Sequence, residues 1–255
     1  MSGYLEAPPR VWPAIKHALS TPALAEKAQQ LWAKQAQHLF KPHKLELSAS
    51  SAGACVLEVW AKLHGKLDIP EDWEARVLKM DGGTMYGAWI AALFTAGWES
   101  KYQDHGVAVE VVGEHDGIPG HVEIVIFEGD TALWVVEIKT SFWGGKFDGS
   151  KAGHILQAAK EALIVKAPGF SILNVLPAAT KQRGTGAKAE YFVQSDHVTA
   201  DHALAVEVEY RRLQRALDPV APTGDATEAW RCNFCQFSGC ERNRNPLNPN
   251  LKATA

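Results

Sequence analysis

Three short apolar stretches, separated by two turn sequences, most constrain what this chain can fold into. Each stretch is rich in valine, isoleucine or aromatic residues, which favour the pleated surface of a β-sheet. The turn sequences EHDGIPG and EGDT contain glycine, proline and aspartate, which reverse a chain between strands. The spacing therefore predicts an antiparallel meander of three strands, which are GVAVEVVG (106–113), GHVEIVIFEG (120–129) and ALWVVEIKTS (132–141).

Helical patterns flank this meander on both sides. Three segments before it and two after it carry apolar residues at helical spacing, and two further strand patterns lie between the last two helices. The predicted helices are 21–40, 48–65, 81–100, 151–167 and 199–217, and the predicted later strands are 171–179 and 189–195. This order predicts an α/β fold in which helices flank a mixed central sheet.

Length and charge narrow the class of protein. A chain of 255 residues is long enough for one large domain with a full core. The formal net charge of −3 gives no global basic signature, so any contact with nucleic acid needs a local patch. No apolar run is long enough to span a bilayer, and three prolines interrupt the first 20 residues, where a signal sequence would lie. We expect a cytoplasmic protein.

The third predicted strand contains an acid and a base. Glu137 and Lys139 project from one face of it, because side chains alternate across a strand. The simplest interpretation is an ion pair on a water-exposed edge strand. If the second and third strands pair through EGDT, however, Glu123 also approaches this end of the sheet. Two carboxylates beside a lysine suit Mg²⁺ or Mn²⁺, with the lysine orienting a water or stabilising charge on a phosphate.

The four cysteines are not scattered. Cys232, Cys235 and Cys240 lie within RCNFCQFSGC, and Cys55 stands far upstream. In a reducing compartment such clustering favours metal or cluster ligation over disulfides. Thiolates suit zinc or an iron–sulfur cluster, and the spacing alone leaves both open.

The acid, the E-x-K strand and the helix that follows resemble the PD-(D/E)XK nuclease superfamily. The segments IPGHVEIVIF, LWVVEIKTS and HILQAA are similar to the RecB-like exonuclease branch, in which the three motifs follow in this order. The resemblance implies a restriction-endonuclease-like fold. It also implies that Glu123 and Glu137 hold Mg²⁺ or Mn²⁺, that Lys139 assists the attack, and that Gln157 positions the substrate strand.

The sequence departs from the family pattern at three positions. Gly87 stands where family members carry a histidine, Glu123 replaces the usual aspartate, and Glu161 replaces the tyrosine of the last motif. His121, His105 or a water are the candidate replacements for the missing histidine.

The cysteine pattern adds a second, independent resemblance. Cys55, Cys232, Cys235 and Cys240 are similar to the ligands of RecB-like nucleases that carry an iron–sulfur cluster, which are the AddB-type nuclease domains and the CRISPR-associated adaptation exonucleases. The resemblance implies a 4Fe–4S cluster that joins the two ends of the fold. We accordingly expect an N-terminal helical extension over 1–47, a RecB-like nuclease domain over 48–240 and a C-terminal tail over 241–255.

Basic residues near the E-x-K strand are the candidates for contact with DNA. They are Lys146, Lys151, Lys181, Arg183 and Lys188. For each of them the simpler interpretation is a solvated turn.

Three hypotheses for function follow. The first is a metal-dependent DNA exonuclease of recombination or repair, with a phage as one candidate source, that acts on DNA ends or single strands in the cytoplasm of a bacterial or phage-infected cell. It would work alone or beside a recombination or replication protein. The second is a catalytically weakened member that binds DNA or serves as a scaffold. The third is a zinc-stabilised domain without nucleic-acid function, in which Glu137 and Lys139 form a surface pair.

Overall fold

The computed structural model describes residues 8–36, 46–67, 73–140, 150–176, 190–225, 232, 235 and 237–242. Helices and strands alternate in these segments in the mixed order that the sequence predicts. In chain order they are α1 (Val11–Ser20), α2 (Pro22–Ala36), the 3₁₀ helix η1 (Ala49–Ser51), α3 (Val56–Leu63), α4 (Trp73–Lys101), β1 (Gly106–His115), β2 (Ile118–Glu128), β3 (Thr131–Thr140), α5 (Ala152–Val165), β4 (Gly169–Leu176), β5 (Glu190–His197), α6 (Ala200–Gln214) and the 3₁₀ helix η3 (Arg215–Leu217).

The strands form one mixed sheet in the order β1-β2-β3-β4-β5. The first three pair antiparallel, as the meander predicts, and β5 pairs antiparallel with β4. The β3–β4 pair is parallel because α5 carries the chain back between the two strands. The strand with the E-x-K motif is therefore the central one, which explains its nearly continuous apolar run. Its interpretation as a water-exposed edge strand is wrong.

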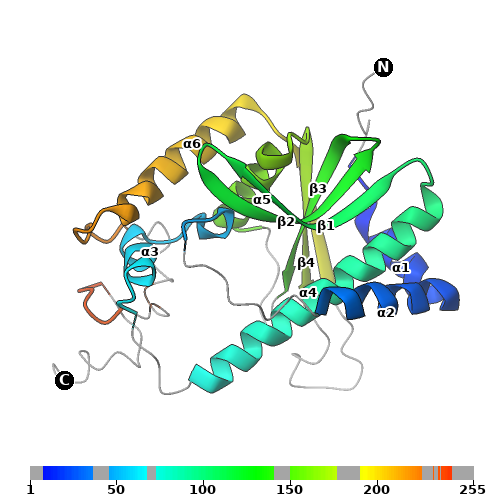
Figure 1. Cartoon of the computed structure of the whole chain (residues 1–255), viewed down its shortest axis with the longest axis horizontal. Coiled ribbons are helices and arrows are strands. Elements are labelled where there is room, and N and C mark those ends of the chain that lie inside the picture. Colours follow the sequence, from blue (N-terminus) through cyan, green and yellow to red (C-terminus); the bar gives the residue numbers. More distant parts are fainter. Residues whose placement is uncertain are drawn as a thin grey trace.

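Helices cover both faces of this sheet (Figure 1). On one face α1, α2 and α4 pack against Val136 and Ile138 of β3. On the other face α5 and α6 pack against Val135 of β3 and its neighbour Ile172 of β4. The expected α/β architecture is confirmed. In the described part of the chain, no helix is both long and apolar enough to cross a membrane.

Two helix boundaries differ from the predicted ones. The helix predicted at 81–100 begins earlier, at Trp73, and the glycines that were expected to open it lie inside α4. The long α4 tolerates them because its C-terminal half is buried against α1 and the sheet, and packing outweighs local helix propensity. The helix predicted at 48–65 is split into η1 and α3, and Cys55 is the residue that immediately precedes α3.

Candidate functional site

The point at which β2 separates from β3 determines the position of Glu123, the first acid of the site. β2 pairs with β3 only from Ile124 onward, whereas it stays paired with β1 as far back as Ile118. Glu123 is the residue at which β2 leaves β3, so the next backbone N–H of β3 has lost its strand partner. The Oε2 atom of Glu123 accepts a hydrogen bond from that group, the N–H of Ile138, at 2.6 Å. Because Ile124 pairs with Val136, Glu123 lies beside Glu137.

A third acid faces this point from β1. The neighbours of Glu110 on either side pair with the neighbours of Glu123, so the two acids oppose each other across the strands. Glu110 has a φ of +53°, in the left-handed region that residues other than glycine rarely adopt. In a regular strand residues two apart lie on the same face. Val109 and Val111 instead pack on opposite faces of the sheet, which shows that β1 kinks at Glu110. Regular alternation predicted none of this, so Glu110 was not a candidate from the sequence.

Helix α5 completes the cluster from the other side. Gln157 donates through Nε2 to Oε1 of Glu137 at 2.9 Å and to Oε1 of Glu161 at 2.8 Å. Its Oε1 atom accepts a hydrogen bond from Nζ of Lys139 at 2.8 Å, and Lys139 also pairs with Glu137. The structure thus brings Glu123, Glu137, Lys139 and Gln157 together as predicted.

Glu161, which departs from the motif pattern in the sequence, also belongs to this cluster. It follows Gln157 by four residues, so the two side chains share one face of α5. That spacing was the available signal. The side chains of Glu137 and Glu161 are 1% and 0% exposed, and in each the Oε2 atom is buried without a hydrogen-bond partner.

Burial and mutual repulsion govern the charges of this cluster. Removal from water, and then the charge of Glu137, raise the pKa of both Glu123 and Glu161 well above its ordinary value. Burial lowers the pKa of Lys139, but the surrounding carboxylates outweigh this effect and raise it overall. Lys139 therefore stays an ammonium, whereas the raised pKa values of Glu123 and Glu161 favour their protonated forms, and a hydrogen bond between the carboxyl groups of Glu161 and Glu137 adds to that effect at Glu161.

The candidate replacements for the motif histidine lie in two different places. His121 is half-exposed on β2, with Nδ1 3.9 Å from Oε2 of Glu110. His105 stacks with Trp98 and Tyr102 near the end of α4, at the start of β1 and away from the acids. Gly87 has open space where a side chain would begin, since within the described residues no atom beyond its own stretch of α4 lies within 4 Å of a Cβ built there.

The cysteines come from both flanks of the fold. Among the described residues these four cysteines form no disulfide bond, and all four are half-buried. A Cβ built at Gly224 would lie 3.5 Å from Sγ of Cys240 and 3.8 Å from Sγ of Cys55. The pKa of Cys235 is raised to about 11, chiefly by burial and in smaller part by the nearby Glu58, Cys240 and Cys55. Three of the four predicted ligands therefore lie near one another, with Cys232 three residues before Cys235.

An ion-pair network holds this region together independently of the thiols. Asp225 accepts hydrogen bonds from the N–H of Val56 at 2.9 Å and from Arg212 at 2.7 Å. Burial alone would raise the pKa of Asp225, but these donors outweigh it and lower the pKa. Glu209 accepts from the N–H of Gly53 at 2.7 Å. The segment that carries Cys55 is thus fixed to α6.

The predicted DNA-contacting residues are only partly placed. Lys151 is exposed immediately before α5, one and a half turns from Gln157. The remaining candidates lie outside the described residues, and they are Lys146, Lys181, Arg183 and Lys188.

Comparison with known proteins gives the fold alone. No family model matches the chain, and no curated protein matches it in sequence. It is similar to the crystal structure of SSO0001, with a TM-score of 0.52 and 14% identity over 88% of this chain and 98% of that chain. The crystal structure of the alkaline exonuclease LHK-Exo from Laribacter hongkongensis aligns with a TM-score of 0.42 and 13% identity, over 71% of this chain and 92% of that chain. The likeness to SSO0001 shows a shared fold, and the likeness to LHK-Exo is too weak to carry an argument.

Proposed function

We propose that the chain is a divalent-metal-dependent deoxyribonuclease that hydrolyses phosphodiester bonds as an exonuclease, on DNA ends or single strands. One observation carries this proposal. Glu137 and Glu161 each bury a carboxylate oxygen without a hydrogen-bond partner, beside the ammonium of Lys139. Buried carboxylate oxygens without partners are costly, and a bound cation is one way in which proteins offset that cost.

The residues present fit Mg²⁺ or Mn²⁺ in their chemistry. Carboxylate oxygens are the donors that these cations prefer, and Glu123, Glu137 and Glu161 would supply them. Among the described residues, no three His, Cys, Asp or Glu side chains converge on one point as a metal site requires. One reason is that Oε1 of Glu137 is engaged by Lys139 and Gln157. Glu123, Glu137 and Glu161 are therefore proposed as ligands on their chemistry and their proximity.

The chain's own residues have distinct roles in this proposal. When bound, the cation would activate a water and polarise the phosphate. Lys139, which stays protonated, donates hydrogen bonds to developing negative charge and does not act as a base. Gln157 positions both Lys139 and Glu137 through its amide.

We also propose a 4Fe–4S cluster held by Cys55, Cys232, Cys235 and Cys240. The proximity of three of these thiols supports it, as does the absence of a side chain at Gly224, which leaves room beside the sulfurs. The cluster would join the flanks of the fold and take no part in hydrolysis. A role in recombination or repair, a phage origin, a cytoplasmic location and a recombination or replication protein as partner belong to the same proposal.

Digestion of end-labelled single- and double-stranded DNA with Mn²⁺ tests the nuclease function. We expect the unmodified chain to release nucleotides and Glu137→Gln to lower the rate at least about a hundredfold. Glu207→Gln is the matched control, because Glu207 pairs with Arg211 on the exposed face of α6. Unmodified protein that binds DNA and never cuts it would favour the second hypothesis, the catalytically weakened DNA-binding member. Equal cleavage rates for Glu137→Gln and the unmodified chain would show that Glu137 is not part of the catalytic site.

A further inference from the structure

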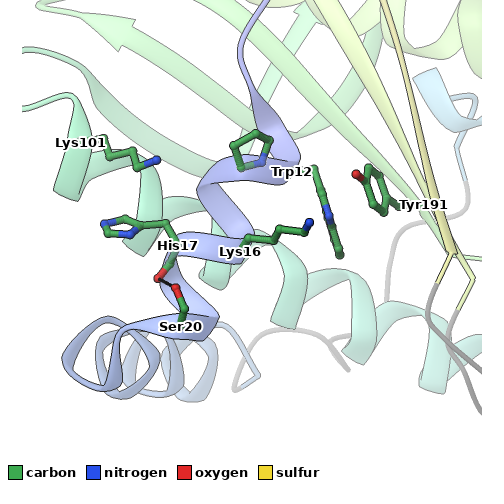
Figure 2. A pocket seen from close by; sticks show the side chains of 7 residues that line it. Trp12, Lys16, His17, Ser20, Lys101 and Tyr191 are labelled. Atoms are coloured by element: carbon green, nitrogen blue, oxygen red, sulfur yellow. Dashed lines mark hydrogen bonds between the residues drawn. The ribbon is translucent and has the colours of Figure 1, made fainter. Parts of the chain in front are cut away.

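A groove of about 600 Å³ lies apart from the carboxylates, between α1, the end of α4 and the start of β5. Figure 2 shows its principal lining side chains, which are Trp12, Lys16, His17, Lys101 and Tyr191. Three of them can carry positive charge and two are aromatic. The proposed hydrolysis uses none of them.

The aromatic side of the groove is a stacked pair. The rings of Trp12 and Tyr191 are 4.0 Å apart between centroids, with 22° between their planes. Trp12 is partly buried and packs against the core beneath α1, whereas Tyr191 remains 43% exposed. An exposed ring backed by a second ring is a rigid platform on which a planar group can stack.

No aspartate or glutamate is among the described residues that line the groove. Lys16 and Lys101 are exposed, and α1 contains no aspartate or glutamate. The nearest acid along α4, Glu99, is held by Lys27 at 2.8 Å, outside the groove. The positive charge here is therefore local, in a chain whose net charge is −3.

The Tyr191 side of the groove lies at the same end of the sheet as the carboxylate cluster, whereas Lys101, at the end of α4, lies near the start of β1. Tyr191 pairs with Val175 of β4, and Val175 pairs with Thr140, the residue after Lys139. Two strand spacings separate Tyr191 from Thr140, which is roughly 10 Å along the sheet. Tyr191 lies on the α1 and α4 face, whereas Lys139 reaches α5 on the other face.

We propose that this groove binds single-stranded nucleic acid, with a base stacked on Tyr191 and backbone phosphates contacting Lys16 and Lys101. The substrate class rests on the proposed nuclease function. A stacking ring that shares one groove with two exposed lysines is a combination by which proteins hold single strands without reading their sequence. A strand in the groove would extend around the end of the sheet toward the carboxylates.

Fluorescence anisotropy of a labelled oligothymidylate, with Ca²⁺ in place of Mn²⁺, tests the groove. We expect Tyr191→Ala to raise Kd about tenfold and Tyr191→Phe to bind as the unmodified chain does, since phenylalanine keeps the stacking face. Lys16→Glu with Lys101→Glu should reduce the slope of log Kd against log salt by about 1.4, the value for two contacts on a single strand. The control is Lys34→Glu with Lys62→Glu, which makes the same charge change on exposed positions of α2 and α3.

The outcomes separate the two proposals. Equal weakening by both lysine pairs, or unchanged binding in Tyr191→Ala, would overturn the groove assignment. Failure of the nuclease proposal appears elsewhere, as no hydrolysis of bis(p-nitrophenyl) phosphate by the unmodified chain with Mn²⁺. A chain that does not hydrolyse this small diester, yet loses oligonucleotide binding on Tyr191→Ala alone, would support the groove and reject the nuclease.

Discussion

Among single residues, Glu161 shows how the carboxylate cluster lowers the stability of the folded chain. Its carboxylate is fully buried, and only Oε1 has a partner. The folded chain binds a proton at Glu161 more tightly than the unfolded chain, because its pKa is raised above the ordinary 4.5. The resulting stability is complete below about pH 4.5 and is lost as the pH rises through the raised pKa.

Glu161→Gln should therefore stabilise the metal-free protein at neutral and higher pH. A glutamine keeps the shape and stays uncharged, so we expect a gain of about 1–3 kcal/mol at pH 8 and a smaller gain near pH 5. Thermal unfolding at both pH values with a chelator present measures it. A variant that is less stable than the unmodified chain at pH 8 would show that the carboxylate is satisfied in the apo fold.

Lys139 is expected to be needed for stability as well as for hydrolysis. Lys139→Ala would leave the buried Glu137 without its counter-charge, at a cost of about 3–5 kcal/mol. Adding Glu137→Gln should recover much of that loss, and urea unfolding of the two single variants and the double variant gives the coupling. Additive losses would mean that the two side chains do not interact in the folded chain.

At the scale of elements, α4 carries two glycines with opposite roles. A Cβ at Gly97 would lie 2.0 Å from the carbonyl oxygen of Ala14, so α1 and α4 touch through their backbones there. A Cβ at Gly87 would meet no atom within 4 Å outside its own stretch of α4, in the part of the chain that the structure describes.

Alanine at these two positions should accordingly have opposite effects. Gly87→Ala should stabilise the protein by about 0.5–1 kcal/mol through helix propensity. Gly97→Ala should force α1 from α4 and cost more than about 2 kcal/mol. Urea unfolding compares the two, and a Gly97→Ala variant as stable as Gly87→Ala would contradict the close packing of α1 on α4.

The elements also show what sequence could predict. The three-strand meander and the alternation of Glu137 and Lys139 follow from patterns of period two, which the structure confirms. The position of Glu123 beside Glu137 follows from the short turn. The left-handed backbone of Glu110 does not, because its neighbours alternate as in a regular strand and only the packing of two faces reveals the kink. The start of α4 at Trp73 was missed because tertiary packing outweighs the glycines.

For the whole molecule, the question is what joins the two flanks. The network around Asp225, Arg212 and Glu209 ties α3 to α6 without any metal. A cluster on Cys55 and the C-terminal cysteines would add a second link that closes a very long loop.

Anaerobically purified protein should therefore be brown and contain iron and sulfide. Cys235→Ala should lose the colour and lower the unfolding temperature, while far-ultraviolet circular dichroism at room temperature stays nearly unchanged because the central sheet and the Asp225 network remain. Colourless unmodified protein that contains zinc would instead support the third hypothesis for the cysteines. A colourless Cys235→Ala variant with an unchanged unfolding temperature would show that the cluster does not stabilise the fold by joining its flanks.

Calorimetric titration with Mn²⁺ decides whether the buried carboxylates form a cation site. We expect the unmodified chain to bind Mn²⁺, Glu137→Gln and Glu161→Gln each to weaken binding at least about tenfold, and Glu207→Gln to leave it unchanged. Equal binding by Glu137→Gln and the unmodified chain would show instead that the cation is held elsewhere.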